Sequence, residues 1–150
     1  MLLFKLSSKV GALLISLSVL TGCATSSQTA DYDQSTPFSN IQNVHVQRQI
    51  NDQRGLEKLI AAELSGRGKT ASYGEPNTKG ENPDAIVTYI DKWYWDITNY
   101  LMELTIFFED PDTGYKFAEG RSFRTSLVRK SPPEMVEEVI DQVYVKANAK

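Results

Sequence analysis

Polar and apolar positions alternate most regularly in the middle of the chain. Residues 85–95 and 98–109 are predicted to form two long strands, each rich in aromatic and β-branched side chains. The Asp-Pro-Asp-Thr-Gly sequence at residues 110–114 is typical of a turn, and residues 115–126 are predicted to return as the next strand. This part of the chain therefore indicates an antiparallel sheet.

The register of the last two strands can also be predicted. If Glu109 lies opposite Tyr115, one face carries favourable cross-strand pairs: Phe107 with Phe117, Glu103 with Arg121, and Leu101 with Phe123. The other face is expected to carry Tyr100, Met102, Leu104, Ile106 and Phe108. There Leu104 and Ile106 would meet the small residues Gly120 and Ala118, leaving a groove in which a helix can settle.

Two amphipathic segments are predicted to form helices. Residues 52–65 carry leucines and an isoleucine at helical spacing, after a short strand at residues 43–48 and before a weak strand at residues 69–73. The final helix begins with a capping box formed by Ser131 and Glu134 and carries a wide apolar stripe. Residues 74–84, rich in proline and glycine, are expected to form a loop.

The order of elements is thus β-α-β-β-β-β-α, which predicts an α+β domain. We expect a largely antiparallel sheet of four to five strands with both helices on one face. The domain is assigned to residues 42–150. It would follow a signal peptide at residues 1–22 and a lipidated cysteine with a flexible tether at residues 23–41.

The leader resembles the export signal of bacterial lipoproteins. Lys5 and Lys9 precede an apolar run at residues 10–20, and this run is too short to span a bilayer. The run ends in Leu20-Thr21-Gly22-Cys23, the pattern of a lipobox. The resemblance implies cleavage between Gly22 and Cys23, a diacylglyceryl group on the Cys23 sulfur and an acyl chain on its amino group. Several acyl chains on one residue make a lasting anchor.

The residue after the cysteine bears on location. In Gram-negative lipoproteins, Asp at this position commonly retains the protein in the inner membrane, whereas this chain has Ala24. The resemblance therefore implies an outer-membrane protein that faces the periplasm. Acidic side chains outnumber basic ones by 19 to 16, and no basic stripe is present, so nucleic acid is not an expected partner.

Several short stretches resemble a family of small bacterial lipoproteins that carry a periplasmic α+β domain of unknown function. They are Asp31-Tyr32-Asp33 with Phe38, the segment from Pro83 to Tyr89, the turn and return from Asp110 and Thr113 to Gly120, and Glu134-Met135-Val136 with Val139. An aromatic residue is common two positions before that glycine in the family, whereas this chain has Ala118. The resemblance implies a membrane-tethered domain and no known activity.

Catalytic and metal-binding constellations are not favoured. His45, the only histidine, is expected on the surface without a nucleophile beside it, and no cluster of zinc ligands is present. The Asp-x-Asp spacing at residues 110–112 is better explained by a hairpin turn than by calcium. Asp84, Asp91, Asp96 and Glu103 could supply an acid–base pair for a hydrolase, but Glu103 already has Arg121 as an expected partner. We therefore expect no enzyme activity, no metal and no cofactor other than the acyl chains.

The most informative cluster is aromatic. Trp93 and Trp95 should project to one face of their strand and Tyr94 to the other, with Tyr100 nearby. Packing of these rings in the core is one explanation. The other is a contact patch for an envelope protein, because Trp, Tyr and Arg dominate binding energies at interfaces. Basic residues are expected at its rim: Arg121, Arg124, Arg129 and Lys130.

The sequence thus predicts a membrane-anchored periplasmic lipoprotein that acts as a non-enzymatic interaction or assembly protein. The patch that would bind its partner comprises Trp93, Tyr94, Trp95, Tyr100, Arg121 and Arg124. The alternative is a module that binds a small ligand or glycan on the open face of the sheet.

Overall fold

The computed structural model of the chain describes residues 24–149. The predicted signal peptide, its cleavage site after Gly22 and the lipidated Cys23 lie outside the described residues. The strands are β1 Ser26–Tyr32, β2 Asn43–Gln47, β3 Thr70–Gly74, β4 Ala85–Asp96, β5 Thr98–Glu109 and β6 Lys116–Arg124; the helices are α2 Leu56–Gly66 and α3 Pro132–Asn148, with short 3-10 turns η1 Phe38–Asn40 and η2 Ser126–Val128.

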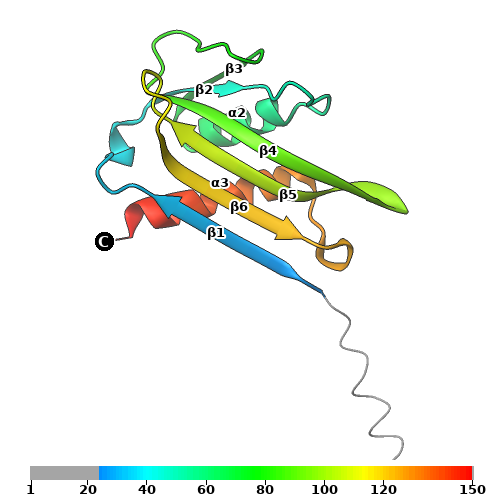
Figure 1. Cartoon of the computed structure of the whole chain (residues 1–150). Helices are drawn as coiled ribbons and strands as arrows, with labels where there is room; N and C mark the ends of the chain where they lie inside the picture. Colours follow the sequence, from blue (N-terminus) through cyan, green and yellow to red (C-terminus); the bar gives the residue numbers. More distant parts are fainter. Residues whose placement is uncertain (1–23, 150) are drawn as a thin grey trace, which may run out of the picture.

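The strands form one open sheet in the order β1-β6-β5-β4-β2-β3. The central strands pair antiparallel, whereas β2 runs parallel to both β3 and β4. The chain crosses from β2 to β3 through α2 and from β3 to β4 through the loop at residues 75–84. Both helices lie on the same face of the sheet (Figure 1). The predicted α+β class with two helices on one face is confirmed, although the sheet has six strands instead of four or five.

The extra strand comes from the segment that was predicted to be a flexible tether. Residues 26–32 form β1, which pairs with β6 along its whole length, from Ser26 opposite Arg124 to Tyr32 opposite Ala118. Most β1 side chains are small, polar and exposed, so they carry no hydrophobic pattern. The strand is held instead by backbone hydrogen bonds to β6, and by Tyr32, which is buried.

The predicted register between β5 and β6 was wrong by two residues. Glu103 lies opposite Phe123 and Thr105 opposite Arg121, with an irregularity between Phe108 and Glu109. The turn before β6 is longer than expected. It is closed by the Asp110 carboxylate, which accepts hydrogen bonds from the backbone N–H groups of Asp112 and Thr113. A shift of two residues preserves the faces, so Glu103 still bonds Arg121, now on the diagonal, with an Nη2–Oε2 distance of 3.0 Å.

A helix does pack at the small residues of β6, but Gly120 lies opposite Ile106 and Ala118 opposite Phe108, instead of opposite Leu104 and Ile106 as predicted. A Cβ atom added to Gly120 would lie 2.7 Å from Val143 Cγ2 and 2.8 Å from the Val139 carbonyl oxygen, so α3 rests directly on the backbone of β6. The predicted capping box of α3 is also present, with the Ser131 N–H 2.8 Å from Glu134 Oε2. Among the helices of residues 24–149, none is both long and apolar enough to cross a membrane.

Candidate functional site

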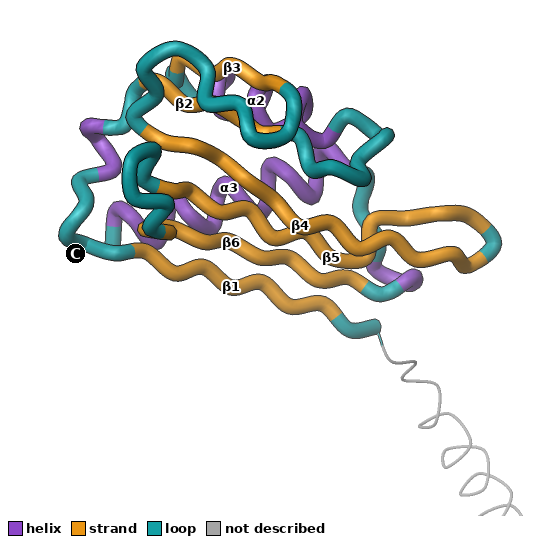
Figure 2. The backbone as a smooth tube through the Cα atoms, turned by 45° about the horizontal axis from the view of Figure 1, so that its top comes forward, coloured by secondary structure: helices purple, strands orange, loops and turns teal. Residues whose placement is uncertain are grey.

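The hairpin formed by β4 and β5 extends well beyond the rest of the sheet (Figure 2). Only Ile97 separates the last paired residues, Asp96 and Thr98, so the turn is very tight. The backbone of Ile97 has a φ of 60°, which is the left-handed region that β-branched residues avoid. The structure therefore holds a strained apolar residue at the tip of an exposed hairpin.

Three large side chains at this tip face solvent. Ile97 is 84% exposed, Trp95 is 68% exposed and Tyr94 is 55% exposed. We refer to Tyr94, Trp95 and Ile97 as the hairpin tip. Single exposed apolar residues are ordinary on a surface, but three large ones within four residues at the end of a projecting hairpin are a candidate for binding.

A β-bulge separates the hairpin tip from the body of the sheet. Lys92 lies opposite Glu103 whereas Trp93 lies opposite Leu101, so Met102 has no partner residue on β4. The extra residue reverses the alternation of β5 on the side of the tip. The prediction that Tyr100 shares a face with Leu104 is wrong for this reason, because Tyr100 lies on the opposite face.

The aromatic residues of the predicted patch divide between the two faces. Trp93 packs partly against the core, with the Arg54 guanidinium 4.2 Å from its ring centroid and its Nε1–H donating to Asp91 Oδ2 at 2.6 Å. Tyr100 is buried and meets the ring of Tyr94 edge-on, with ring centroids 6.1 Å apart. The alternation of Trp93, Tyr94 and Trp95 is as expected, but only Tyr94 and Trp95 are well exposed.

The two arginines assigned to the patch are engaged elsewhere. Arg121 is bound to Glu103, and Arg124 is bound to Glu138 of α3, with little of its side chain exposed. The neighbouring Arg129 does lie beside the aromatic residues: its Nη1 donates to Thr98 Oγ1 at 2.9 Å and its guanidinium lies over the Tyr100 ring. Of the predicted patch, only Tyr94 and Trp95 are well exposed; Ile97 beside them was not predicted, and Arg129 lies at the base of the hairpin.

His45 is buried, which corrects the expectation that it lies on the surface. Its ring nitrogens lie 2.8 Å from Ser72 Oγ and 2.9 Å from Thr78 Oγ1, beneath the loop at residues 75–84. Burial lowers the pKa of His45, so the neutral ring is favoured. This histidine serves to hold the loop against the sheet.

The carboxylates considered for hydrolysis are not paired with one another. Asp84 accepts hydrogen bonds from the backbone N–H groups of Gln42 and Asn43, which lowers its pKa. Asp91 accepts a hydrogen bond from the indole N–H of Trp93, and Glu103 forms ion pairs with Arg121 and Lys92. Within residues 24–149, no group of three or more possible metal ligands is found.

A buried polar network lies beneath the loop that leads into α2. Asp52 is only 2% exposed, and its Oδ2 accepts hydrogen bonds from the Tyr89 hydroxyl at 2.7 Å and the Leu56 N–H at 2.9 Å. Burial alone would raise the pKa of Asp52, but these bonds and one from the Arg54 N–H outweigh it and lower the pKa. The pKa of Tyr89 is raised by burial and by its bond to Asp52. This network orders the start of α2.

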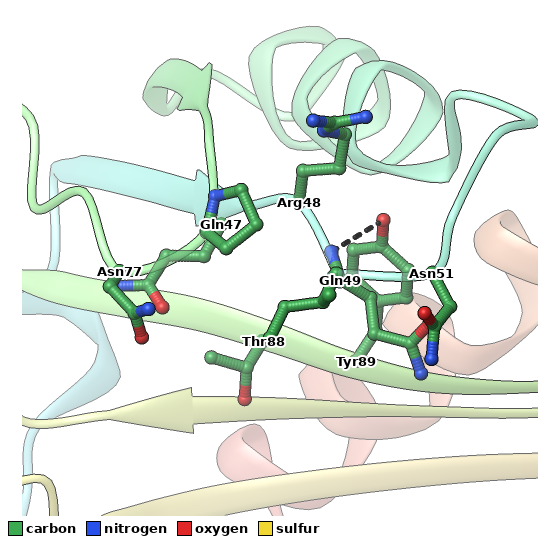
Figure 3. A pocket seen from close by; sticks show the side chains of 9 residues that line it. Gln47, Arg48, Gln49, Asn51, Asn77, Thr88 and Tyr89 are labelled. Atoms are coloured by element: carbon green, nitrogen blue, oxygen red, sulfur yellow. Dashed lines mark hydrogen bonds between the residues drawn. The ribbon is translucent and has the colours of Figure 1, made fainter.

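Next to this network is a groove of about 330 Å³ (Figure 3). Amide side chains and the Tyr89 ring form much of its wall, and the Tyr89 hydroxyl accepts a hydrogen bond from the Gln49 N–H at 3.2 Å. The residues that line it are Gln47, Arg48, Gln49, Ile50, Asn51, Pro76, Asn77, Thr88 and Tyr89. The amide and hydroxyl groups of this groove can hydrogen-bond a ligand, although more of its exposed lining is apolar than polar.

Sequence reasoning missed Ile97 and Leu127, an exposed residue of η2. A signal for Ile97 was present, because a β-branched apolar residue between two strands is an unusual choice for a turn. Asn51 or Asp52 is an expected cap of the first helix, and Asp52 does accept the N–H of Leu56 at the start of α2. The bond from Tyr89 to Asp52 was not predicted, because Tyr89 is 37 residues away in the chain.

Comparison with known proteins identifies the fold and no more. No protein-family model matches the chain, and no curated protein matches it by sequence. Among solved structures, the PelC dodecamer from Paraburkholderia phytofirmans in space group P6 matches with a TM-score of 0.55 at 12% identity, over 84% of this chain and 99% of that chain. The fold resembles that of PelC.

A second PelC structure agrees with the first. A variant PelC dodecamer from the same organism, in space group C2, matches with a TM-score of 0.51 at 14% identity, over 85% of this chain and 98% of that chain. PelC thus shares the whole α+β architecture with this chain. At these identities the likeness concerns the fold alone.

Proposed function

We propose that this chain is a membrane-anchored lipoprotein of the bacterial cell envelope, placed at the periplasmic side of the outer membrane, and that it acts by binding other envelope components. The leader and the Leu20–Cys23 pattern support the anchor. The side chains that could take part in acid–base catalysis support binding without catalysis. His45, Asp84 and Glu103 each make a structural hydrogen bond or ion pair.

The hairpin tip is the observation that carries this proposal. Trp95 and Ile97 are the most exposed large side chains of the hairpin, and the turn keeps Ile97 outward at the expense of backbone strain. Strain of this kind persists where the surrounding structure enforces it, and it is concentrated at functional sites. A projecting tip of exposed apolar side chains is suited to binding and contributes little to the core.

Site-specific photo-crosslinking in the native membrane tests this function. A photoreactive phenylalanine analogue would replace Trp95 in one variant and Val145 in the other, since Val145 is equally exposed but lies near the end of α3, at the other end of the molecule. We expect adducts with an envelope protein or with lipid from position 95 and none from position 145. Absence of adducts at both positions would contradict the proposal.

A second candidate function is binding of a small polar ligand or glycan. The amide-lined groove beside Tyr89 favours it, because Gln, Asn and Tyr side chains suit hydroxyl-rich ligands. A thermal-shift panel of cell-wall fragments tests this function: one fragment should raise the melting temperature, and Gln49→Ala should abolish the rise. If no fragment raises the melting temperature, this candidate is excluded.

A further inference from the structure

The hairpin tip and the start of β1 lie at the same end of the molecule. Residue Ser26 pairs with Arg124 at the end of β6, and β6 ends beside the outer half of β5. Figures 1 and 2 show the hairpin pointing toward the end at which β1 begins. Leu127, which is 72% exposed, follows β6 at this end as well.

The hairpin also projects further from the end of the sheet than the short segment between Cys23 and Ser26 can extend. Residues 98–102 of β5 run beyond the last β5–β6 pair, Glu103 with Phe123, and at ~3.3 Å per residue they extend roughly 15 Å. Cys23 precedes Ser26 by three residues, a span of at most ~10 Å when fully extended. A lipid on Cys23 therefore holds this end of the sheet so close to the bilayer that the tip meets the membrane unless the molecule tilts far over.

The composition of the tip suits such a contact. Indole rings concentrate at the boundary between headgroups and hydrocarbon, and exposed aliphatic side chains enter it. Arg129, exposed at the base of the hairpin, can meet lipid phosphates, whereas the acidic residue of the turn, Asp96, is half-buried. A specific protein interface needs about 800 Å² on each partner, far more than a narrow tip of three side chains presents.

We propose that Trp95 and Ile97 are a second membrane anchor, inserted into the interface of the leaflet that holds the acyl chains. The inference rests on the proposed function, because it requires lipid on Cys23, and it names the bilayer as the component that the hairpin tip binds. Two contacts on one body would fix the orientation of the domain, which a single flexible anchor does not do.

Quenching of tryptophan fluorescence tests this inference. The lipidated mature chain would be placed in vesicles of phosphatidylethanolamine and phosphatidylglycerol, with part of the phospholipid carrying brominated acyl chains that quench nearby indoles. We expect strong quenching in the wild type and its loss in Trp95→Phe, which retains only the half-buried Trp93. Equal quenching in the two proteins, or none in the wild type, would overturn the inference.

Substitution of Ile97 separates membrane contact from folding. Ile97→Asn should reduce the quenching several-fold while the melting temperature stays the same or rises, because Asn tolerates the left-handed backbone. The matched control Val145→Asn should leave the quenching unchanged. If the quenching in Ile97→Asn equals that of the wild type, Ile97 does not insert.

The two proposals can fail separately. A protein adduct from position 95 in the native membrane, combined with an unquenched Trp95 in vesicles, would overturn the membrane contact and leave the proposed function standing. A free thiol at Cys23 in the native protein would remove the proposed function together with the inference.

Discussion

The backbone conformation and the exposure of Ile97 both disfavour the folded state. Its left-handed backbone is disfavoured by ~1–2 kcal/mol for an L-residue with a Cβ, and its side chain gains nothing from the core because it is 84% exposed. A residue of this kind contributes nothing to stability in solution, so its side chain is best explained by contact with something outside the chain.

The Ile97→Asn variant is therefore expected to be more stable than the wild type. Release of the strain should raise the free energy of unfolding by ~1 kcal/mol, measured by urea denaturation. Val145→Asn, at an exposed helical position, should lower it by a few tenths of a kcal/mol. A clear loss of stability in Ile97→Asn would show that the side chain has a structural role.

Asp52 is the opposite case, a charged residue on which local structure depends. In Asp52→Asn the amide offers one acceptor where the carboxylate had two, so one of three buried donors loses its partner. We expect a loss of ~2–3 kcal/mol in the free energy of unfolding. Asp112→Asn, at an exposed turn position, is the control and should change it little.

The same carboxylate predicts a dependence on pH. The pKa of Asp52 in the folded protein lies below its ordinary value of 3.8, so its contribution to stability is complete above that value. The contribution is then lost as pH falls toward the pKa of the folded state. The difference in the free energy of unfolding between the wild type and Asp52→Asn should therefore stay constant from neutral pH down to 3.8 and shrink below it, whereas a difference that stays constant below pH 3.8 would contradict this assignment.

At the scale of elements, the contact between α3 and β6 depends on a glycine, because α3 packs directly on the backbone of Gly120. Gly120→Ala would press a methyl group against Val143 and the Val139 carbonyl, and overpacking of this kind costs ~1–3 kcal/mol. Gly66→Ala is the matched control, because no atom lies within 4 Å of the added Cβ at the end of α2. Thermal unfolding should show a fall in melting temperature for the first and no fall for the second.

The elements that the sequence predicted well are those with long, regular apolar patterns. β4, β5 and α3 lie close to their predicted positions because alternation or helical spacing continues over many residues. β1 escaped prediction because its backbone pairs with β6 while most of its side chains stay polar and exposed. The bulge at Met102 escaped because a period of two assumes that no residue is inserted.

The candidate site was predicted only in part, for a similar reason. The aromatic hairpin was identified from its composition, but the exposure of each ring depends on the bulge and on Arg54 and Arg129, which come from other elements. The burial of His45 depends on a distant loop that folds back over β2. There Gly80 allows the close approach, since an added Cβ would lie 2.6 Å from His45 Nδ1.

At the scale of the whole molecule, the proposed lipid anchor and the hairpin tip lie at one end, and most of the domain lies at the other. β1 links the two, because it pairs with β6 from Ser26 onward and leaves almost no tether after Cys23. The anchor is the premise on which this arrangement depends.

Intact mass spectrometry of the protein extracted from its native membrane tests that premise most directly. The account predicts a chain that begins at Cys23 and carries the added mass of a diacylglyceryl group and an amide-linked acyl chain, both lost in Cys23→Ala. A chain that retains residues 1–22 with an unmodified Cys23 would contradict the account.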